Sequence, residues 1–299
     1  MVSSIASSPA IDLAGLPPPD VIAQPDFEAR LAAKLAQLVA LFPDYSALVE
    51  SDPAMKLLEA DSYDELVQAQ AFADAARGLL IAYATGPRLD HLAALYGVVR
   101  LVVTPANPGA GVPAVLESDT ALRQRVQLAP HSFSVAGPEL AYVYHARSAH
   151  GDVADATAVS PTPGQVVVTV LSGSGSGVPS GAVLTAVRAG LDGDVRPLTD
   201  EVIVQPASLV DFTVSAQLHV FAGPDQELIR QTALASLTAH LAATRRLGRD
   251  IARSAIIAAL HVANVQRVEL LQPTGDIAIS PAQIGNTTSV TVTVAGSEL

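Results

Sequence analysis

The hydrophobic periodicity of the chain changes near residues 150–152, and this change constrains the fold more than any other feature. Before it, apolar residues recur three and four positions apart, as in Leu31, Leu35 and Leu38, which is the spacing of an amphipathic helix. After it, short β-branched runs such as residues 165–171 alternate with helical segments between glycines and prolines. The sequence therefore predicts an α+β protein, with an N-terminal helical region followed by two small mixed α/β modules.

Residues 1–25 are predicted to form an extended N-terminal arm. Pro17, Pro18 and Pro19 fix φ and exclude a helix there. Isolated apolar side chains in such an arm need a surface to lie on, either the chain's own domain or a neighbouring protein. The candidate interface residues of the arm are therefore Ile11, Leu13, Leu16 and Val21.

Residues 26–100 are predicted to form a helical bundle region. Asp26 precedes the first helical run, and Ser51-Asp52-Pro53 places a capping side chain before a first-turn proline. We expect the second helix to run on toward Tyr83, and a short third helix to end at Gly97.

Three further segments complete the predicted organisation. Residues 101–150 form a linker loop and connecting helices, residues 151–206 the first α/β module, and residues 207–299 the second. Each module repeats a strand, a helical part and a return strand, which indicates an old duplication.

Composition argues against several classes of function. The net charge of −12 repels nucleic acid and anionic membrane surfaces, and the absence of cysteine excludes disulfides and thiol catalysis. No apolar run approaches the roughly 18 residues of a membrane span, and the N-terminus lacks the basic segment of a signal peptide. We expect a soluble protein made in the cytoplasm, without cofactors. Because few residues are charged (15%) and alanine is abundant, part of the apolar surface is expected to face partner subunits.

The Ser/Gly run at residues 172–177 follows a predicted strand and precedes a helix, as a phosphate-binding loop does. A Walker loop also needs a lysine, and the last lysine in the chain is Lys56. The dinucleotide fingerprint fails as well, because Val178 stands where the third glycine should be. The run is interpreted as a flexible turn.

An acidic cluster and a basic cluster have structural interpretations that compete with functional ones. The carboxylates of Glu59, Asp61, Asp64 and Glu65 are interpreted as a solvated helix face beside Lys56 rather than as catalytic acids. The basic group lacks the interleaved aromatic residues of a nucleic-acid site. We therefore expect it at a protein interface or, failing that, on plain surface: Arg245, Arg246, Arg249 and Arg253.

The segment from residue 128 to 152 holds residue types that could form a hydrolytic triad: Ser132, Ser134, His145, His150 and Asp152. A serine hydrolase of this kind would also show a nucleophile elbow such as G-x-S-x-G, which is absent around both serines. His145 and His150 are five residues apart, so they do not share a helix face as a zinc-binding i,i+4 pair does. The preferred interpretation is a structural joint in which the serines cap and the aromatic residues pack.

A series of short motifs, taken in order along nearly the whole chain, resembles the baseplate J-like proteins of contractile-tailed phages and tailocins. The strongest block is L-A-P-x-S-F-S-V-A-G-P at residues 128–138, followed by Tyr142, His145-Ala146 and Gly151-Asp152-Val153. Further matching motifs are I-D-L at 11–13, E-S-D-P at 50–53, A-Y-A-T-G at 82–86, L-D-H-L-A at 89–93, D-V-R-P-L-T-D at 194–200, G-R-D-I at 248–251 and G-D-I at 275–277. His131 departs from the pattern, which has glutamate there.

The resemblance implies a structural, non-enzymatic protein of the virion tail baseplate, assembled in the host cytoplasm. It implies that two copies pair with one copy of a second wedge protein through the N-terminal helices. The C-terminal part, residues 207–299, would join neighbouring wedges into a ring around the central hub and spike, and this ring rearranges on contraction. A cell-wall or polysaccharide hydrolase using His145 or His150 is the alternative, and a receptor-binding module is a third class.

Overall fold

A computed structural model describes residues 13, 16, 17, 19, 26–43, 49–134, 136–222 and 225–298 of the chain. The described part divides into two compact units, residues 11–99 and a larger unit that includes residues 100–299. Helices dominate the first unit, and strands and helices alternate in the second, which confirms the predicted α+β class.

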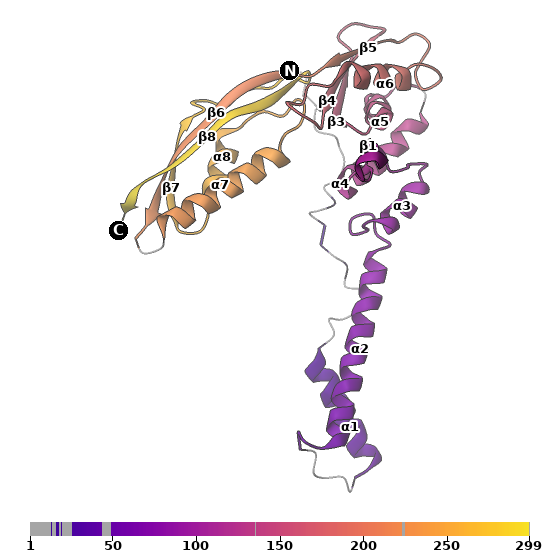
Figure 1. The fold of residues 1–299 in the computed structure, drawn as a ribbon, viewed down its shortest axis with the longest axis vertical. Coiled ribbons are helices and arrows are strands. Elements are labelled where there is room, and N and C mark those ends of the chain that lie inside the picture. Colours follow the sequence, from indigo (N-terminus) through magenta and orange to yellow (C-terminus); the bar gives the residue numbers. More distant parts are fainter. Residues whose placement is uncertain are drawn as a thin grey trace. The chain divides into compact units, whose positions relative to one another are not determined.

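The smaller unit is helical. Its elements are α1 (Phe27–Leu41), α2 (Pro53–Arg77) and α3 (Pro87–Ala94), and α1 and α2 lie side by side (Figure 1). The predicted cap is present at Asp52, whose side chain accepts from Ala54 N at 2.9 Å, and the side chain of Asp26 caps α1 by accepting from Glu28 N at 3.0 Å. Each capping carboxylate satisfies a backbone N–H that has no partner within its helix.

The second helix ends earlier than the hydrophobic pattern predicts, at Arg77 rather than near Tyr83. Gly78 follows it and is closely packed, since a Cβ at this position would lie 2.7 Å from Arg88 Nη1. Glycine has a low helix propensity, and residues 79–83 continue as turns. The helical pattern beyond residue 77 is therefore realised only as isolated turns.

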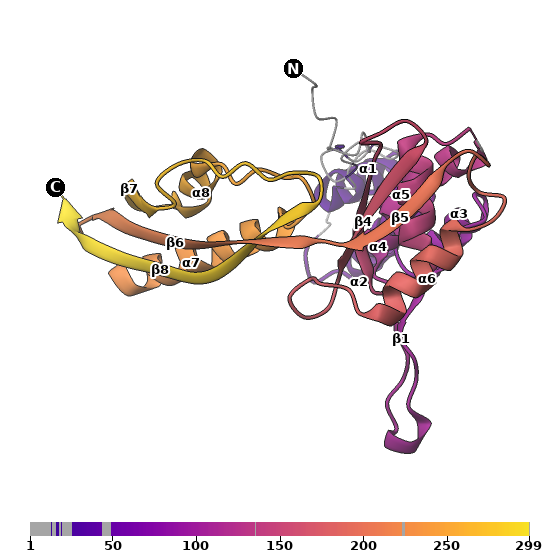
Figure 2. The same ribbon diagram turned by 90° about the horizontal axis from the view of Figure 1, so that it is seen from above.

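The larger unit begins with a hairpin and three helical segments. The hairpin strands are β1 (Val102–Thr104) and β2 (Val115–Leu116), and Figure 2 shows their connection projecting as a narrow loop. The segments that follow are α4 (Asp119–Leu128), the 3-10 turn η3 (Ala129–Phe133) and α5 (Glu139–Ala149). A further 3-10 turn, η2 (Pro108–Ala110), lies at the hairpin tip. The sequence predicts only a strand and a Pro/Gly loop here, because β2 is too short to show an alternating pattern.

A first three-stranded sheet has the order β3-β4-β5. Its strands are β3 (Val153–Val159), β4 (Gln165–Ser172) and β5 (Glu201–Pro206), and α6 (Gly181–Leu191) connects the last two. β4 is antiparallel to β3 and parallel to β5. Apolar residues of α5 and α6 pack against β4 around the fully buried Val168 and Val170.

A second three-stranded sheet has the order β7-β6-β8. Its strands are β6 (Ser208–Phe221), β7 (Val265–Gln272) and β8 (Gln283–Glu298), and the connection between β6 and β7 contains α7 (Gln226–Ala243) and α8 (Arg253–Leu260). Alternate residues of β6, from Phe212 to Val220, pack against both helices. Each sheet thus has a central strand with one antiparallel and one parallel neighbour, although the order of connections differs between them.

Candidate assembly surfaces

The contact between α1 and α2 combines apolar side chains with ion pairs. Leu31 of α1 is buried, and Lys34 binds Asp61 at 2.5 Å and Glu65 at 3.0 Å. Arg30 reaches the same Glu65 at 3.1 Å. Asp61 and Glu65 therefore pair with the basic residues of α1, which sequence reasoning missed because α1 and α2 contact each other only in the tertiary structure. Glu59 pairs with Lys56 at 2.8 Å within its own helix.

Helix α2 exposes several large apolar side chains. Of the 25 residues in this helix, only Ser62 and Ala73 are buried. Leu57 is 72% exposed and Phe72 73% exposed. We use the name "outer residues of α2" for the following exposed apolar side chains: Leu57, Tyr63, Val67 and Phe72. These side chains stand among exposed polar ones, including Asp64, Gln68 and Asp74, and exposed apolar side chains on a helix are candidates for contact with a partner protein.

The candidate residues of the N-terminal arm are only partly described. Leu13 is half-buried and Leu16 is exposed, and the Leu16 carbonyl accepts a hydrogen bond from the Tyr83 hydroxyl. This bond ties one point of the arm to the turns that follow α2. Ile11 and Val21 lie outside the described residues.

The four candidate arginines have different environments. Arg253 is half-buried and donates to the carbonyls of Leu270, at 3.1 Å, and Pro273. Arg245 is exposed and donates to the Ser176 carbonyl. Arg246 and Arg249 are exposed and line a groove of about 540 Å³ that also includes Ile284 and Gly285 at the start of β8.

The serines and histidines of the segment from 128 to 152 have separate local partners. Ser132 Oγ donates to the Ala129 carbonyl at 2.7 Å, and Ser134 Oγ accepts from Ala136 N at 3.3 Å. The His145 ring contacts Tyr144 edge to face with centroids 5.3 Å apart. Each serine thus caps its own turn.

The two remaining members of the possible triad are also engaged locally. His150 Nδ1 accepts a hydrogen bond from Asp152 N at 3.1 Å. The Asp152 carboxylate accepts from Ser172 Oγ at 2.5 Å and from Ser174 Oγ at 3.2 Å. The Ser/Gly run therefore folds back on Asp152, an arrangement that orders this turn.

The motif block around Gly137 packs against the D-V-R-P-L-T-D segment. Tyr142 donates a hydrogen bond from its hydroxyl to Asp200 Oδ2 at 2.5 Å. Burial, with this hydrogen bond, raises the pKa of Tyr142 well above its usual range. Gly137 has φ of 76°, and a Cβ there would lie 2.9 Å from Pro197 Cγ. These contacts hold the motif block around Gly137 against the segment that contains Pro197 and Asp200.

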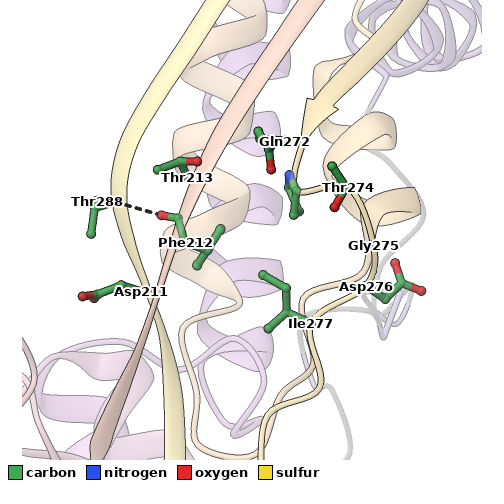
Figure 3. A pocket seen from close by; sticks show the side chains of 10 residues that line it. Asp211, Phe212, Thr213, Gln272, Thr274, Gly275, Asp276, Ile277 and Thr288 are labelled. Atoms are coloured by element: carbon green, nitrogen blue, oxygen red, sulfur yellow. Dashed lines mark hydrogen bonds between the residues drawn. The ribbon is translucent and has the colours of Figure 1, made fainter.

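A hollow of about 600 Å³ lies between strands β6 and β8 and the loop after β7 (Figure 3). Its two carboxylates already have partners, since Asp211 accepts from Asn286 Nδ2 at 2.6 Å and Asp276 from Arg253 N at 2.8 Å. Thr288 donates to the Phe212 carbonyl at 3.1 Å. The polar groups are thus paired with one another and do not converge on a common point.

The described residues contain no group of three or more His, Asp or Glu side chains placed to hold a metal ion. None of their helices combines the length and apolarity needed to cross a membrane.

Three family models match the chain in consecutive segments. They are the Baseplate J-like N-terminal domain at residues 50–107, the Baseplate J-like central domain at residues 134–206, and the Baseplate J-like protein C-terminal domain at residues 211–293. The chain is 45% identical to "Baseplate protein J" of Escherichia phage P2 over 300 residues, which cover 97% of this chain and 99% of that protein. These matches do not support the hydrolase alternative.

A solved structure of the anti-feeding prophage (AFP) baseplate also matches. The alignment covers 59% of this chain and 44% of the solved chain, with 17% identity and a TM-score of 0.43. The chain thus spans less than half the length of that solved protein.

Proposed function

The chain belongs to the baseplate J-like family, and from this premise we propose that it is a structural wedge component of a contractile-tail baseplate. Its place of action is the virion tail, and its assembly takes place in the host cytoplasm. The proposal describes a non-enzymatic protein whose activity consists of its contacts with other baseplate proteins.

The exposed apolar side chains of α2 are the observation that carries this proposal. Burying a Leu, Val or Phe side chain contributes about 1.5–3 kcal/mol. The outer residues of α2 include one of each type, all exposed in the single chain. A third helix laid on this surface would complete a bundle that α1 and α2 form only in part.

We propose that this third helix comes from a partner, with two copies of the chain joined to one copy of a second wedge protein. The ion pairs of Lys34 with Asp61 and Glu65 would hold α1 and α2 in register for that contact. The apolar residues of the N-terminal arm, including Leu13 and Leu16, are proposed to lie along the same assembly.

We assign the proposed roles to five segments of the chain. The arm is residues 1–25, the bundle region is 26–100, and the connecting part is 101–150. The first α/β module is 151–206, and the second, 207–299, would join neighbouring wedges into a ring around the hub. Arg245, Arg246 and Arg249 are proposed as ring contacts, because arginine is favoured where a protein meets an acidic neighbour and this chain carries a net charge of −12.

Co-expression with the neighbouring tail proteins, followed by native mass measurement, tests this function. The expected complex contains two copies of the 30.7 kDa chain and one copy of a second protein. A chain that recruits none of these proteins at micromolar concentration would contradict the proposal.

A further inference from the structure

The groove lined by Arg246 and Arg249 combines an apolar floor with basic side chains, and we use the name "arginine groove" for it. Its volume is about 540 Å³. Among its lining residues, Phe212, Ile256 and Ile284 are buried, while Arg246 and Arg249 are exposed. Sites that bind ligands are typically concave and mostly apolar, with a few polar groups that fix the orientation of the ligand. The arginine groove has this composition.

The Ser/Gly run after β4 contributes one wall of the arginine groove. Gly175 and Ser176 line it, and the Ser176 carbonyl accepts a hydrogen bond from Arg245. Gly177 lets the run approach this closely, since a Cβ there would lie 2.9 Å from Arg245 Nη2. The run therefore has a place in the fold next to the arginines that does not involve a phosphate ligand.

Arg246 and Arg249 differ from the other basic residues because neither has a hydrogen bond or an ion pair from its side chain among the described residues. The chain has 29 acidic and 17 basic residues, so a basic side chain has many carboxylates to pair with. Every other lysine and arginine side chain of the described residues has a hydrogen-bonding or ionic partner. The two cations without such a partner thus lie in the same groove.

The acidic group of the arginine groove does not neutralise these cations. Asp250 is its carboxylate, and it accepts a hydrogen bond from Ile279 N at 2.7 Å. The lining contains three arginines and one aspartate, which leaves an excess of two positive charges in a chain whose net charge is −12. A ligand that fits the groove therefore carries negative charge and apolar surface together.

We propose that the arginine groove binds an acidic peptide segment with apolar side chains, contributed by a neighbouring tail protein. The planar guanidinium groups of Arg246 and Arg249 can each bind a carboxylate through two parallel hydrogen bonds. Apolar side chains of the segment would cover the floor and remove it from water. The proposal rests on the assembly role proposed above and names the chemistry of one partner.

A second copy of this chain suits the arginine groove less well as the source of the segment. The densest acidic run is residues 59–65, which lie in α2. Asp61 and Glu65 in it bind basic residues of α1, and Glu59 binds Lys56. Two copies with a net charge of −12 also repel each other. The partner is therefore assigned to a different protein.

Nucleic acid is also a poor match for this groove. A nucleic acid carries a negative charge at every phosphate, so the net charge of the chain opposes its approach. Single strands bind on exposed aromatic rings, and the aromatic residue of this lining, Phe212, is buried.

Peptide binding to the full chain tests the proposal. One set of overlapping peptides spans the neighbouring tail proteins, and a second set spans this chain. The peptides that bind should come from the first set and combine Asp or Glu with Leu, Ile or Phe. Fluorescence anisotropy of the strongest peptide should show weaker binding when its acidic residues become amides, and again when its apolar residues become serine. Added salt should weaken binding because it screens the charges.

Single substitutions locate the bound peptide. Arg246→Gln and Arg249→Gln should each raise the Kd of the strongest peptide by about tenfold, because each removes a charge-assisted hydrogen bond. Both side chains are exposed, so thermal unfolding of the two variants should match that of the natural chain. Arg230→Gln is the matched control, because it removes the same charge from an exposed pair with Glu227 on α7, and it should leave the Kd unchanged.

Four results would overturn the proposal: no peptide of either set binds, the bound peptides are neutral or basic, they come only from this chain, or Arg230→Gln weakens binding as much as Arg249→Gln. A single-stranded oligonucleotide that displaces the peptide and itself loses affinity in Arg249→Gln would assign the groove to nucleic acid instead.

The groove and the wedge function fail separately. Arg249→Gln should still co-purify with a second wedge protein through the helices. If acidic peptides bind but no second wedge protein is recruited, the wedge function is wrong and the groove assignment stands. If recruitment is intact but no peptide binds, the groove assignment is wrong and the wedge function stands.

Discussion

Glu117 and Arg125 form a buried bidentate ion pair. Arg125 Nε lies 2.8 Å from Glu117 Oε1 and Nη2 lies 2.7 Å from Oε2, and neither side chain is more than 6% exposed. The carboxylate also accepts from Leu101 N at 3.2 Å, and Arg125 Nη1 donates to Ser148 Oγ at 3.2 Å. The pair therefore links the base of the β1–β2 hairpin to α4 and α5.

Removing one partner of this pair should be strongly destabilising. Arg125→Met leaves the Glu117 carboxylate buried without its counter-charge, which costs about 3–5 kcal/mol. Urea unfolding of the full chain measures the loss. The double variant Glu117→Gln/Arg125→Met should recover part of it, because no uncompensated charge remains. As a control, Arg230→Met breaks the exposed pair with Glu227 and should cause no measurable change.

Gly151 is required because β1 passes directly against it. A Cβ at this position would lie 2.4 Å from the Val102 carbonyl oxygen and 2.9 Å from Val103 Cα, both backbone atoms. Gly151→Ala should therefore cost about 1–3 kcal/mol, the usual range for overpacking. Gly181→Ala is the matched control, since nothing lies within 4 Å of its added Cβ. It stands at the start of α6, so we expect a neutral or slightly stabilising effect. Equal thermal midpoints for the two variants would contradict the packing argument.

His145 should make stability depend on pH. Burial lowers the pKa of His145 below its ordinary value of 6.5, because the imidazolium form is poorly solvated there. Its Nε2 is buried and has no hydrogen-bond partner among the described residues. Below pH 6.5 the unfolded chain binds a proton that the folded chain resists, so stability is complete above 6.5 and falls as pH decreases toward the lowered pKa.

The variant His145→Phe keeps an aromatic ring and removes the titration. Between pH 7.5 and about 5.5, its urea midpoint should fall less than that of the natural chain. His131→Phe is the control at an exposed histidine and should keep the natural pH dependence. Parallel pH profiles for the natural chain and His145→Phe would argue against His145 as the source.

The outer residues of α2 should govern recruitment of the second wedge protein without governing the fold. Leu57→Glu places a charge on a side chain that is 72% exposed, so the stability of the single chain should change by less than about 0.5 kcal/mol. In the complex the same charge would be buried, and co-purification should be lost. Leu228→Glu, at a leucine of α7 that is 63% exposed, is the matched control and should still co-purify. A Leu57→Glu chain that retains the full complex would place the contact elsewhere.

Local features could be predicted from the sequence because neighbouring residues produce them. The cap predicted at Asp52 is present, and Ser118 and Ser180 also cap their helices by accepting from backbone N–H groups three residues on. Hydrophobic period and capping chemistry act within one or two turns of chain. The motif order along the chain likewise predicted the family.

Pairing between distant segments could not be predicted in this way. In the sequence, the acidic residues of α2 have the pattern of a solvated helix face. In the structure, Asp61 pairs with Lys34 of α1, which is 27 positions away along the chain. Arg253 resembles the neighbouring arginines in sequence, yet it donates inward to the carbonyls of Leu270 and Pro273. A side chain's partner depends on which segment folds against it, and sequence spacing does not record that.

The sequence by itself determined the α+β class, the positions of most helices and strands, and the family of this chain, because period, caps and motif order are properties of contiguous residues. The tertiary structure decided which partners the side chains of the segment from 128 to 152 bind, which apolar side chains of α2 stay exposed, and that β8 is an edge of its sheet. These three results depend on which surfaces the folded chain covers, and burial is decided by long-range packing rather than by local sequence.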